Sequence, residues 1–377
     1  MVMRTVVAVI VAWMCLGSAS LRAAELPPAE PVLTDAMKKP PEWFATAEGK
    51  ALADNLVSWQ NPEGGWWKQY DPKHPRPAPL PPANQTGPGA SNDQEDAWRN
   101  SSTFDNGATY TEMRLLARAY NATKDEKYKQ SFQRGLKFVF DAQYPNGGVP
   151  QRFPLQNNYG RHITFNDKLM SSVMLMLKEI ADGKPEFAFV GNHDRKRAKE
   201  SFDRGVECIL KMQIENPAGE LTGWCQQHDA ETLAPTSARA YELPSIASFE
   251  TADIVVMLMQ IEQPDDRVRR AITSAAKWFE KSAIQGKRYE TIRDKSLKYG
   301  VDRKLSDDPT APPLWARFYE IETNKPIFAD RDGVKRYDLS ELGDERRAKY
   351  AWYGNWGEKV LAELPKWEKR EGKSAQR

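Results

Sequence analysis

The sequence predicts an all-α protein, an (α/α)3 toroid whose long loops form a groove at one rim. The first observation is a repeat of helical segments that end in Gly- or Pro-containing turns. Each is followed, after a loop, by a segment that starts with Thr-Phe or Ser-Phe. The endings are residues 58–66, 142–148 and 212–219, and the beginnings are residues 103–106, 164–167 and 248–251. Because a repeated helix–loop–helix unit buries its apolar stripe only against its neighbours, we expect three hairpins that close on one another.

The second observation is the helical spacing of apolar residues in each expected helix. The helices before the loops carry Leu52, Leu56 and Trp59, then Tyr128, Phe132 and Leu136, then Phe202, Val206, Ile209 and Leu210. The helices after the loops carry Met113, Leu116 and Tyr120, then Met170, Val173, Met174 and Leu177, then Ile254, Met257, Leu258 and Ile261. A further helix is expected at about 268–282 and a short β-hairpin at 330–338. No strand-like alternation is long enough to predict a sheet domain.

The first loop, at about 64–102, is long and contains five prolines between residues 75 and 82, which exclude regular helix. Loops of this length in compact domains are usually functional or disordered. We expect the Pro- and Gly-rich stretch to be a solvated flap, and the chemistry to lie on the helix starts beside it.

The N-terminus, residues 1–24, has the composition of a secretory signal, with Arg4, an apolar run and small residues before the expected cleavage site. That run is too short to cross a bilayer, so we expect an exported protein, periplasmic or secreted, without membrane insertion. The rest of the chain is divided into an N-terminal extension at 25–44, one functional domain at 45–365 and a charged C-terminal tail at 366–377.

The charge balance argues against a nucleic-acid partner. The formal net charge is +2, and removal of residues 1–24 would take away Arg4 and Arg22 and no acid, which leaves a net charge of zero. The mature chain would keep Cys208 and Cys225. These two cysteines could form a disulfide in an oxidising compartment, but the sequence does not give their separation.

Acidic residues mark the helix starts at the rim. The repeat suggests that Asp105, Asp167 and Glu250 occupy matching positions. Each alone could serve to complement a helix dipole, but the repeat brings the aspartates to one rim. Two clustered carboxylates there indicate acid–base catalysis or a site for a hard cation, and Asn106 and Asn166 add neutral oxygens suited to Ca2+.

Aromatic residues follow the Gly-containing turns, and we expect Trp66, Trp67, Trp224 and Tyr144 at the rim, where flat aromatic side chains can stack on sugars. The four histidines show no catalytic-triad order and no His-x-x-x-His spacing, which argues against a hydrolytic triad and a zinc site.

Five segments together carry a resemblance to a known family. They are FDNGATYT at 104–111, AQYPNGG at 142–148, ITFND at 163–167, ARAYELP at 238–244 and WARFYE at 315–320. In this order they resemble the pectate lyases of polysaccharide lyase family 10, and the likeness runs from about residue 45 to 356. The resemblance implies an (α/α)3 toroid, dependence on Ca2+ and β-elimination on polygalacturonate.

The same resemblance implies roles for individual residues. Asp105 and Asp167 would bind Ca2+ and, through it, the substrate carboxylate; Arg239 would be the catalytic base; and Arg317 would contact a substrate carboxylate. Further substrate contacts are expected from Asn166, Tyr241, Trp66 and Lys68. Arginine is a poor base because it is normally always protonated, so we expect an alkaline optimum.

Two alternatives to a lyase remain open. A glycoside hydrolase of the same architecture would use Asp105 and Asp167 as acid and base, without a metal, and would leave saturated products. A non-catalytic uronide-binding protein would bind the polymer without turnover. The lyase is favoured because acids and amides cluster with arginine, and because no acid is expected in an apolar setting that would raise its pKa.

Overall fold

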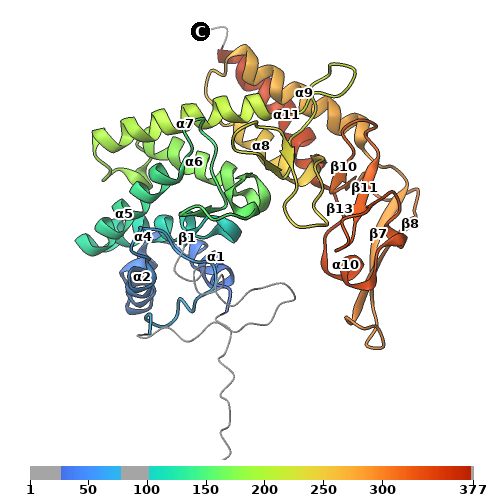
Figure 1. Cartoon of the computed structure of the whole chain (residues 1–377). Coiled ribbons are helices and arrows are strands. Elements are labelled where there is room, and N and C mark those ends of the chain that lie inside the picture. The colour runs from blue at the N-terminus through green and yellow to red at the C-terminus, as the bar shows by residue number, and fades with distance from the viewer. Residues whose placement is uncertain (1–26, 78–101, 375–377) are drawn as a thin grey trace, which may run out of the picture.

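The computed structural model describes residues 27–77 and 102–374, so the expected signal segment lies outside the described residues. In Figure 1 the helices follow one another along an arc, in the paired arrangement of an (α/α)3 toroid, which confirms the predicted fold class. The α-helices are α1 Glu30–Met37, α2 Ala47–Trp59, α4 Tyr110–Thr123, α5 Glu126–Ala142, α6 Leu169–Ala181, α7 Asn192–Met212, α8 Ser248–Leu258, α9 Asp266–Ser282, α10 Asp344–Lys349 and α11 Trp356–Ser374.

Helix pairing places the long loops together. Short connections join α4 to α5, α6 to α7 and α8 to α9, and the two members of each pair pack against each other. The connections that precede α4, α6 and α8 are longer and carry short strands. Helices α4, α6 and α8 are successive neighbours, and α11 packs on α8 and α9 at the C-terminal end.

The expected apolar stripes are the core of these pairs. On α6, the four predicted positions, Met170, Val173, Met174 and Leu177, have no exposed surface. Side-chain caps begin several helices, for example Asp265, whose carboxylate accepts a hydrogen bond from the Val268 amide at 2.9 Å at the start of α9. At the start of α9, local capping and core packing therefore specify the same helix boundary.

Short antiparallel strands connect each long loop to the next. The first loop pairs with the second through β1 Ser102–Thr103 and β2 Arg152–Phe153, and the second with the third through β3 Ile163–Thr164 and β4 Gln227–His228. The third loop pairs with the C-terminal region through β6 Ile246–Ala247 and β10 Phe318–Tyr319. Strand β5 Pro235–Thr236 pairs with β4, while β9 Trp315–Ala316 and β13 Tyr353–Gly354 form a separate pair. These separate pairings hold neighbouring loops together at one rim.

Two hairpins lie in the C-terminal third. Strands β11 Pro326–Ala329 and β12 Lys335–Arg336 pair and flank the predicted hairpin turn. Strands β7 Lys287–Arg293 and β8 Val301–Asp307 form a second, longer hairpin that the sequence reading did not anticipate. Most of its residues are polar and partly exposed, so it lacks the apolar alternation by which strands are recognised.

The ends of the predicted domain are part of the folded body. In the N-terminal extension, α1 packs on α4 and buries Leu33 and Ala36. At the other end, α11 runs through residue 365, so the expected start of a separate tail lies inside a helix. Cys208 and Cys225 are both buried and both free. Among the described residues, no helix combines the length and the apolar character required to cross a membrane.

The rim position expected for Trp66 and Trp224 is wrong, because both side chains are fully buried. Each indole N–H donates to a carbonyl of the preceding helix, Trp66 to Leu56 at 2.8 Å and Trp224 to Ile209 at 2.7 Å. A side chain enclosed in this way cannot stack on a sugar. Trp66 is therefore a core residue and not the substrate contact predicted for it.

Replacement of Trp66 by alanine should destabilise the fold by about 3–5 kcal/mol, because it removes a fully buried indole and leaves a cavity. Denaturant-induced unfolding measures this difference. The matched control is Trp67→Ala, since Trp67 is only partly buried and its ring stacks with the Arg152 guanidinium at 5.0 Å. That control should cost about 1 kcal/mol or less. Equal losses in the two variants would contradict the assignment of Trp66 to the core.

Candidate active site

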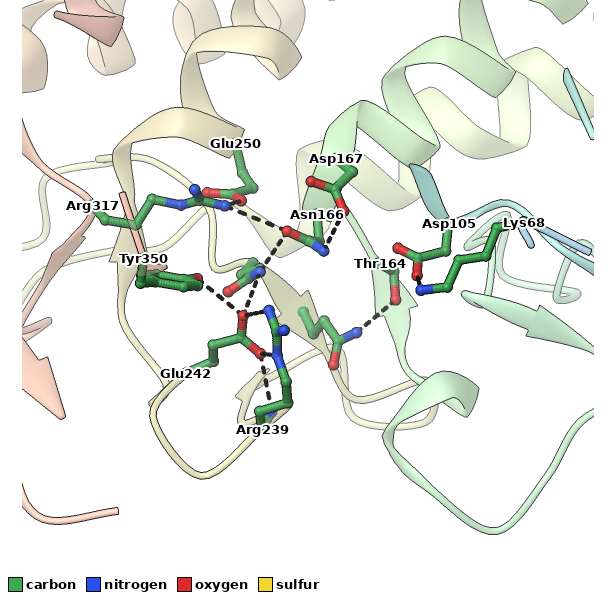
Figure 2. A network of polar contacts seen from close by, with 12 residues as sticks. Lys68, Asp105, Thr164, Asn166, Asp167, Arg239, Glu242, Glu250, Arg317 and Tyr350 are labelled. Carbon is green, nitrogen blue, oxygen red and sulfur yellow. Dashed lines mark hydrogen bonds and ion pairs between the residues drawn. The ribbon is translucent and has the colours of Figure 1, made fainter. Parts of the chain in front are cut away.

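Most of the predicted site residues meet in one polar network at the rim (Figure 2). Asp105 and Lys68 lie at one side of this network and Arg239 and Arg317 at the other, with Asn166 between them. The residues come from the loops before α4, α6 and α8 and from the strands after α9, so segments far apart in the sequence build it.

The repeat has a register that differs by one residue from the one expected. The register follows from one backbone hydrogen bond that recurs in all three repeats. In each repeat, the amide of the last residue of strand β1, β3 or β6 donates to the carbonyl of the residue that follows the preceding Gly-containing turn. The pairs are Thr103 to Trp66 at 2.9 Å, Thr164 to Val149 at 3.0 Å and Ala247 to Trp224 at 2.8 Å.

In this register Asp105 matches Asn166, whereas Asp167 matches Asn106 and Glu250. The backbone agrees, because Asn106 and Asp167 both have φ 51°, a left-handed conformation that Asn and Asp tolerate. The expectation that Asp105 and Asp167 occupy equivalent positions is therefore wrong. The two carboxylates still meet, because the short 3-10 turns η2 Asp105–Gly107 and η4 Asn166–Lys168 lie side by side.

Asp105 is a buried carboxylate that is held in its charged form. It forms an ion pair with the Lys68 ammonium, and its backbone amide donates to the Thr103 hydroxyl at 3.1 Å. Burial by itself would raise the pKa of Asp105, but the positive charges of Lys68 and Arg152 outweigh it and lower the pKa below its ordinary value.

Asp167 has the opposite electrostatic setting. Burial, followed by the nearby negative charge of Asp105, raises the pKa of Asp167 to about 6. The Asn166 amide group donates to the Asp167 carboxylate at 2.9 Å. The expectation that no acid has a raised pKa is thus wrong, because the packing that raises it comes from residues distant in the sequence. Among the described residues, no cluster of three or more His, Cys, Asp and Glu side chains is placed to hold a metal.

Asn166 is engaged on both sides of its amide. While its nitrogen donates to Asp167, its oxygen accepts from Gln226 at 2.6 Å and from Arg317 at 3.4 Å. Asn166 therefore links the carboxylate half of the network to the arginine half.

Arg239 is clamped by a carboxylate that the sequence reading did not single out. Its Nε lies 2.7 Å from Oε2 of Glu242, its Nη2 pairs with Oε1, and its backbone amide donates to Oε2 at 3.1 Å. Burial alone would lower the pKa of Arg239, but the Glu242 charge raises it above its ordinary value. The Arg239 side chain is still 43% exposed, so it is open to the rim.

Glu242 is itself almost fully buried and is oriented by neighbours on both sides. The Tyr350 hydroxyl donates to Oε1 of Glu242 at 3.0 Å, and the Gln226 amide donates to the same oxygen at 3.2 Å. The one sequence signal for Glu242 is its position three residues after Arg239 in the same motif. Tyr350 has no such local signal.

Arg317 is the more deeply buried of the two arginines in the network. Its Nη2 is 2.5 Å from Oε1 of the fully buried Glu250, and its guanidinium lies 4.6 Å from the ring centre of Phe249 and 5.5 Å from that of Tyr350. Burial raises the pKa of Glu250, and the Arg317 charge offsets part of that increase. Arg317 is therefore a fixed positive charge behind Asn166.

Three further features border the network. Tyr241, which is nearly buried, lies under the Arg239 guanidinium at 4.9 Å and also contacts Arg346 at 4.4 Å. A cavity of about 460 Å³ reaches Asp167 and is lined on its other side by residues of α1. The Lys168 ammonium, which follows Asp167 in the sequence, is 3.4 Å from a carboxylate oxygen of Asp253 on α8.

Comparisons with known proteins agree on one family. A family model described as pectic acid lyase matches residues 60–361. A family 10 polysaccharide lyase from Cellvibrio cellulosa has a similar structure, with a TM-score of 0.72 and 32% identity over 90% of this chain and 96% of that chain. An Asp-to-Ala mutant of a family 10 lyase from the same organism, in complex with trigalacturonic acid, gives a TM-score of 0.70 and 32% identity over 89% and 98% of the two chains. No curated protein matches.

Proposed function

The chain belongs to the pectic acid lyase family, and we propose that it cleaves α-1,4-linked polygalacturonate by Ca2+-assisted β-elimination, with unsaturated oligogalacturonides as products. The observation that carries this proposal is the polar network in which Asn166 links Asp167 to Arg317 and, through Gln226 and Glu242, to Arg239. The Lys68–Asp105 ion pair lies beside this network. An acidic polymer needs positive charge for binding, and its C5 proton needs an acceptor close to a group that stabilises charge on the neighbouring carboxylate. The complex of a similar lyase with trigalacturonic acid supports the same substrate class.

The carboxylate half of the network fits a hard cation. The charged groups that could bind a metal there are carboxylate oxygens only. Because Asp105 and Asp167 lie close together, their negative charges repel each other, and a divalent cation would offset this repulsion. Asp105 and Asp167 would hold the ion, with other oxygen ligands from amides, water or the substrate. When bound, Ca2+ supplies positive charge to the substrate carboxylate and so makes the C5 proton more acidic.

The arginine half would bind and deprotonate the sugar. Arg317 and Lys68 place positive charge on either side of the carboxylate pair, where a uronate can bind. Arg239 would accept the C5 proton. The C–H electron pair then forms the C4–C5 double bond, and the C4–O bond breaks with its electrons on the leaving sugar. Because Glu242 raises the pKa of Arg239, the neutral form that can accept a proton is scarce near neutral pH. That form becomes more abundant as pH increases, so we expect an alkaline optimum.

Activity on polygalacturonate should depend on added divalent cation and should be highest with Ca2+. Excess chelator should reduce the ultraviolet absorbance of unsaturated product to background, and Ca2+ added back should restore it. Heavily methyl-esterified pectin should be a poor substrate, because an ester cannot bridge to a cation as a carboxylate does. Full activity in chelator would contradict the metal role.

One observation favours a glycoside hydrolase as a second candidate. A carboxyl with a raised pKa beside one with a lowered pKa is the pattern of a general acid and its partner, and Asp167 and Asp105 have it. Saturated reducing ends formed without metal would identify this reaction. Binding of the polymer without any product would instead identify a uronide-binding protein.

We also propose that the protein is exported, on the signal-like composition of residues 1–24, which lie outside the described residues. The mass of the mature protein tests this, since cleavage after Ala24 would remove that segment.

A further inference from the structure

The β7–β8 hairpin is rich in cations, and those near its base are neutralised by acidic partners. Lys287 pairs with Asp307 at 2.6 Å, Arg288 with Asp308 at 2.5 Å and Lys304 with Glu290 at 3.4 Å. Such exposed pairs contribute little to stability, but they cancel the local field. The base of the hairpin therefore offers no net attraction to an anion.

The cations at the tip of the hairpin, residues 293–300, differ from the paired cations at its base. Arg293, Lys295 and Lys298 are exposed, and among the described residues none of them has a carboxylate within ion-pair distance. The single acid there, Asp294, is occupied by the turn, because its carboxylate accepts from the Ser296 amide and hydroxyl, both at 2.8 Å. The tip is therefore an ordered turn with a net positive charge, because its three cations outnumber the one carboxylate of Asp294.

The hairpin is also linked to the candidate active site. The half-buried ring of Tyr299 is 4.5 Å from the Lys349 ammonium at the end of α10. The next residue, Tyr350, accepts a hydrogen bond from Arg303 of β8 at its carbonyl, at 2.8 Å, and donates its hydroxyl to Glu242. Tyr350 thus contacts both the hairpin and the partner of Arg239, while Figure 1 shows β7 and β8 beside α10 at the edge of the molecule.

We propose that the hairpin tip, with Arg293, Lys295, Lys298 and Lys349, is a distal binding site for the acidic polysaccharide. It would attract carboxylates of uronate units beyond those held in the active site, so long chains would benefit and short oligomers would not. This inference rests on the proposed function for its choice of polyanion. Unpaired surface charge of this kind raises local substrate concentration and association rate, and salt screens it.

The test is the triple variant R293Q/K295Q/K298Q, which removes the tip charge and leaves α10 intact. At about 20 mM salt its kcat/KM on polygalacturonate should fall about tenfold, whereas its kcat/KM on trigalacturonate should stay within about twofold of wild type. At about 0.5 M salt the difference on the polymer should disappear. Because all three positions are exposed, the melting temperature should not change.

The matched control is K196Q/K211Q/K277Q, which removes three exposed lysines from the outer helices α7 and α9 and changes the net charge equally. An unchanged kcat/KM on the polymer in the tip variant would overturn the inference. An equal loss on trigalacturonate, or an equal loss in the control, would also overturn it, because the effect would then belong to the active site or to overall charge. If the triple variant does not fold, R293Q and K298Q alone should each show part of the same loss.

Failure of the proposed function is distinguishable from failure of this inference. A wild-type protein that forms no product from either substrate would refute lyase activity. Calorimetric binding of polygalacturonate would then decide the role of the tip: about tenfold weaker binding by the triple variant supports the distal site, and equal binding overturns it.

Discussion

Replacement of Asp167 by asparagine should lower turnover on polygalacturonate by at least about two orders of magnitude while the protein melts at or above the wild-type temperature. The loss follows from the proposed metal role of Asp167. Removal of one of two charged oxygen ligands would weaken the binding of a cation whose charge would supply several kcal/mol to the reaction. The retained stability follows from electrostatics. Burial and Asp105 raise the pKa of Asp167 to about 6, so its negative charge at pH 7 destabilises the folded state.

The destabilising effect of the Asp167 charge can be checked by measuring stability as a function of pH. Because the folded pKa of Asp167 is raised above its unfolded value, its protonated form stabilises the fold at low pH, and this contribution is lost as pH rises from about 4 to 6. Thermal melts across this range should show a smaller loss of stability in Asp167→Asn than in wild type, because the other buried carboxyls with raised pKa, such as Glu112, are present in both.

The matched control is Asp253→Asn, a partly buried carboxylate with a raised pKa that pairs with Lys168 outside the network. It should retain activity. Asp105→Ala should also abolish turnover, but it would leave the Lys68 ammonium without its partner and is therefore expected to cost stability as well. A fully active Asp167→Asn variant would contradict the proposed role of this residue as a metal ligand.

Replacement of Arg239 by lysine should lower kcat by at least about two orders of magnitude with little change in the binding of oligogalacturonates. Lysine keeps the charge and much of the reach, but it cannot form the two-point contact by which Glu242 orients the guanidinium. Proton transfer needs reacting atoms about 3–3.5 Å apart, and a displacement of about 1 Å can cost roughly a hundredfold. Ultraviolet assays for kcat and KM, with calorimetry for binding, measure both effects.

Glu242→Gln is the companion variant, because it preserves much of the shape of the contact and removes the charge. Since Glu242 raises the pKa of Arg239, its loss should move the rise of kcat/KM with pH to lower pH if Arg239 accepts the proton. If Arg239 only attracts the polyanion, Arg239→Lys should mainly raise KM, and the pH profile of Glu242→Gln should keep its position.

Much of the fold could be predicted because the relevant signals are local. Apolar spacing on α6 and α9 marks helices whatever they pack against, and the motifs around Asp105, Asp167 and Arg239 place the chain in its family. The β7–β8 hairpin was missed for the same reason. Its strands are held by backbone pairing and charged partners, and neither leaves an apolar period in the sequence.

The sequence by itself therefore determined the helical hairpins, the family and the identities of the acids and arginines at the rim. Only the tertiary structure decided that Trp66 is core, that Asp105 matches Asn166, and that Glu242 and Glu250 are the partners of the two arginines. The physical reason is that burial and pKa depend on groups brought together in space. Asp105 meets Lys68 across 37 residues and Asn166 meets Arg317 across 151, and the field that sets each charge exists only after those segments pack.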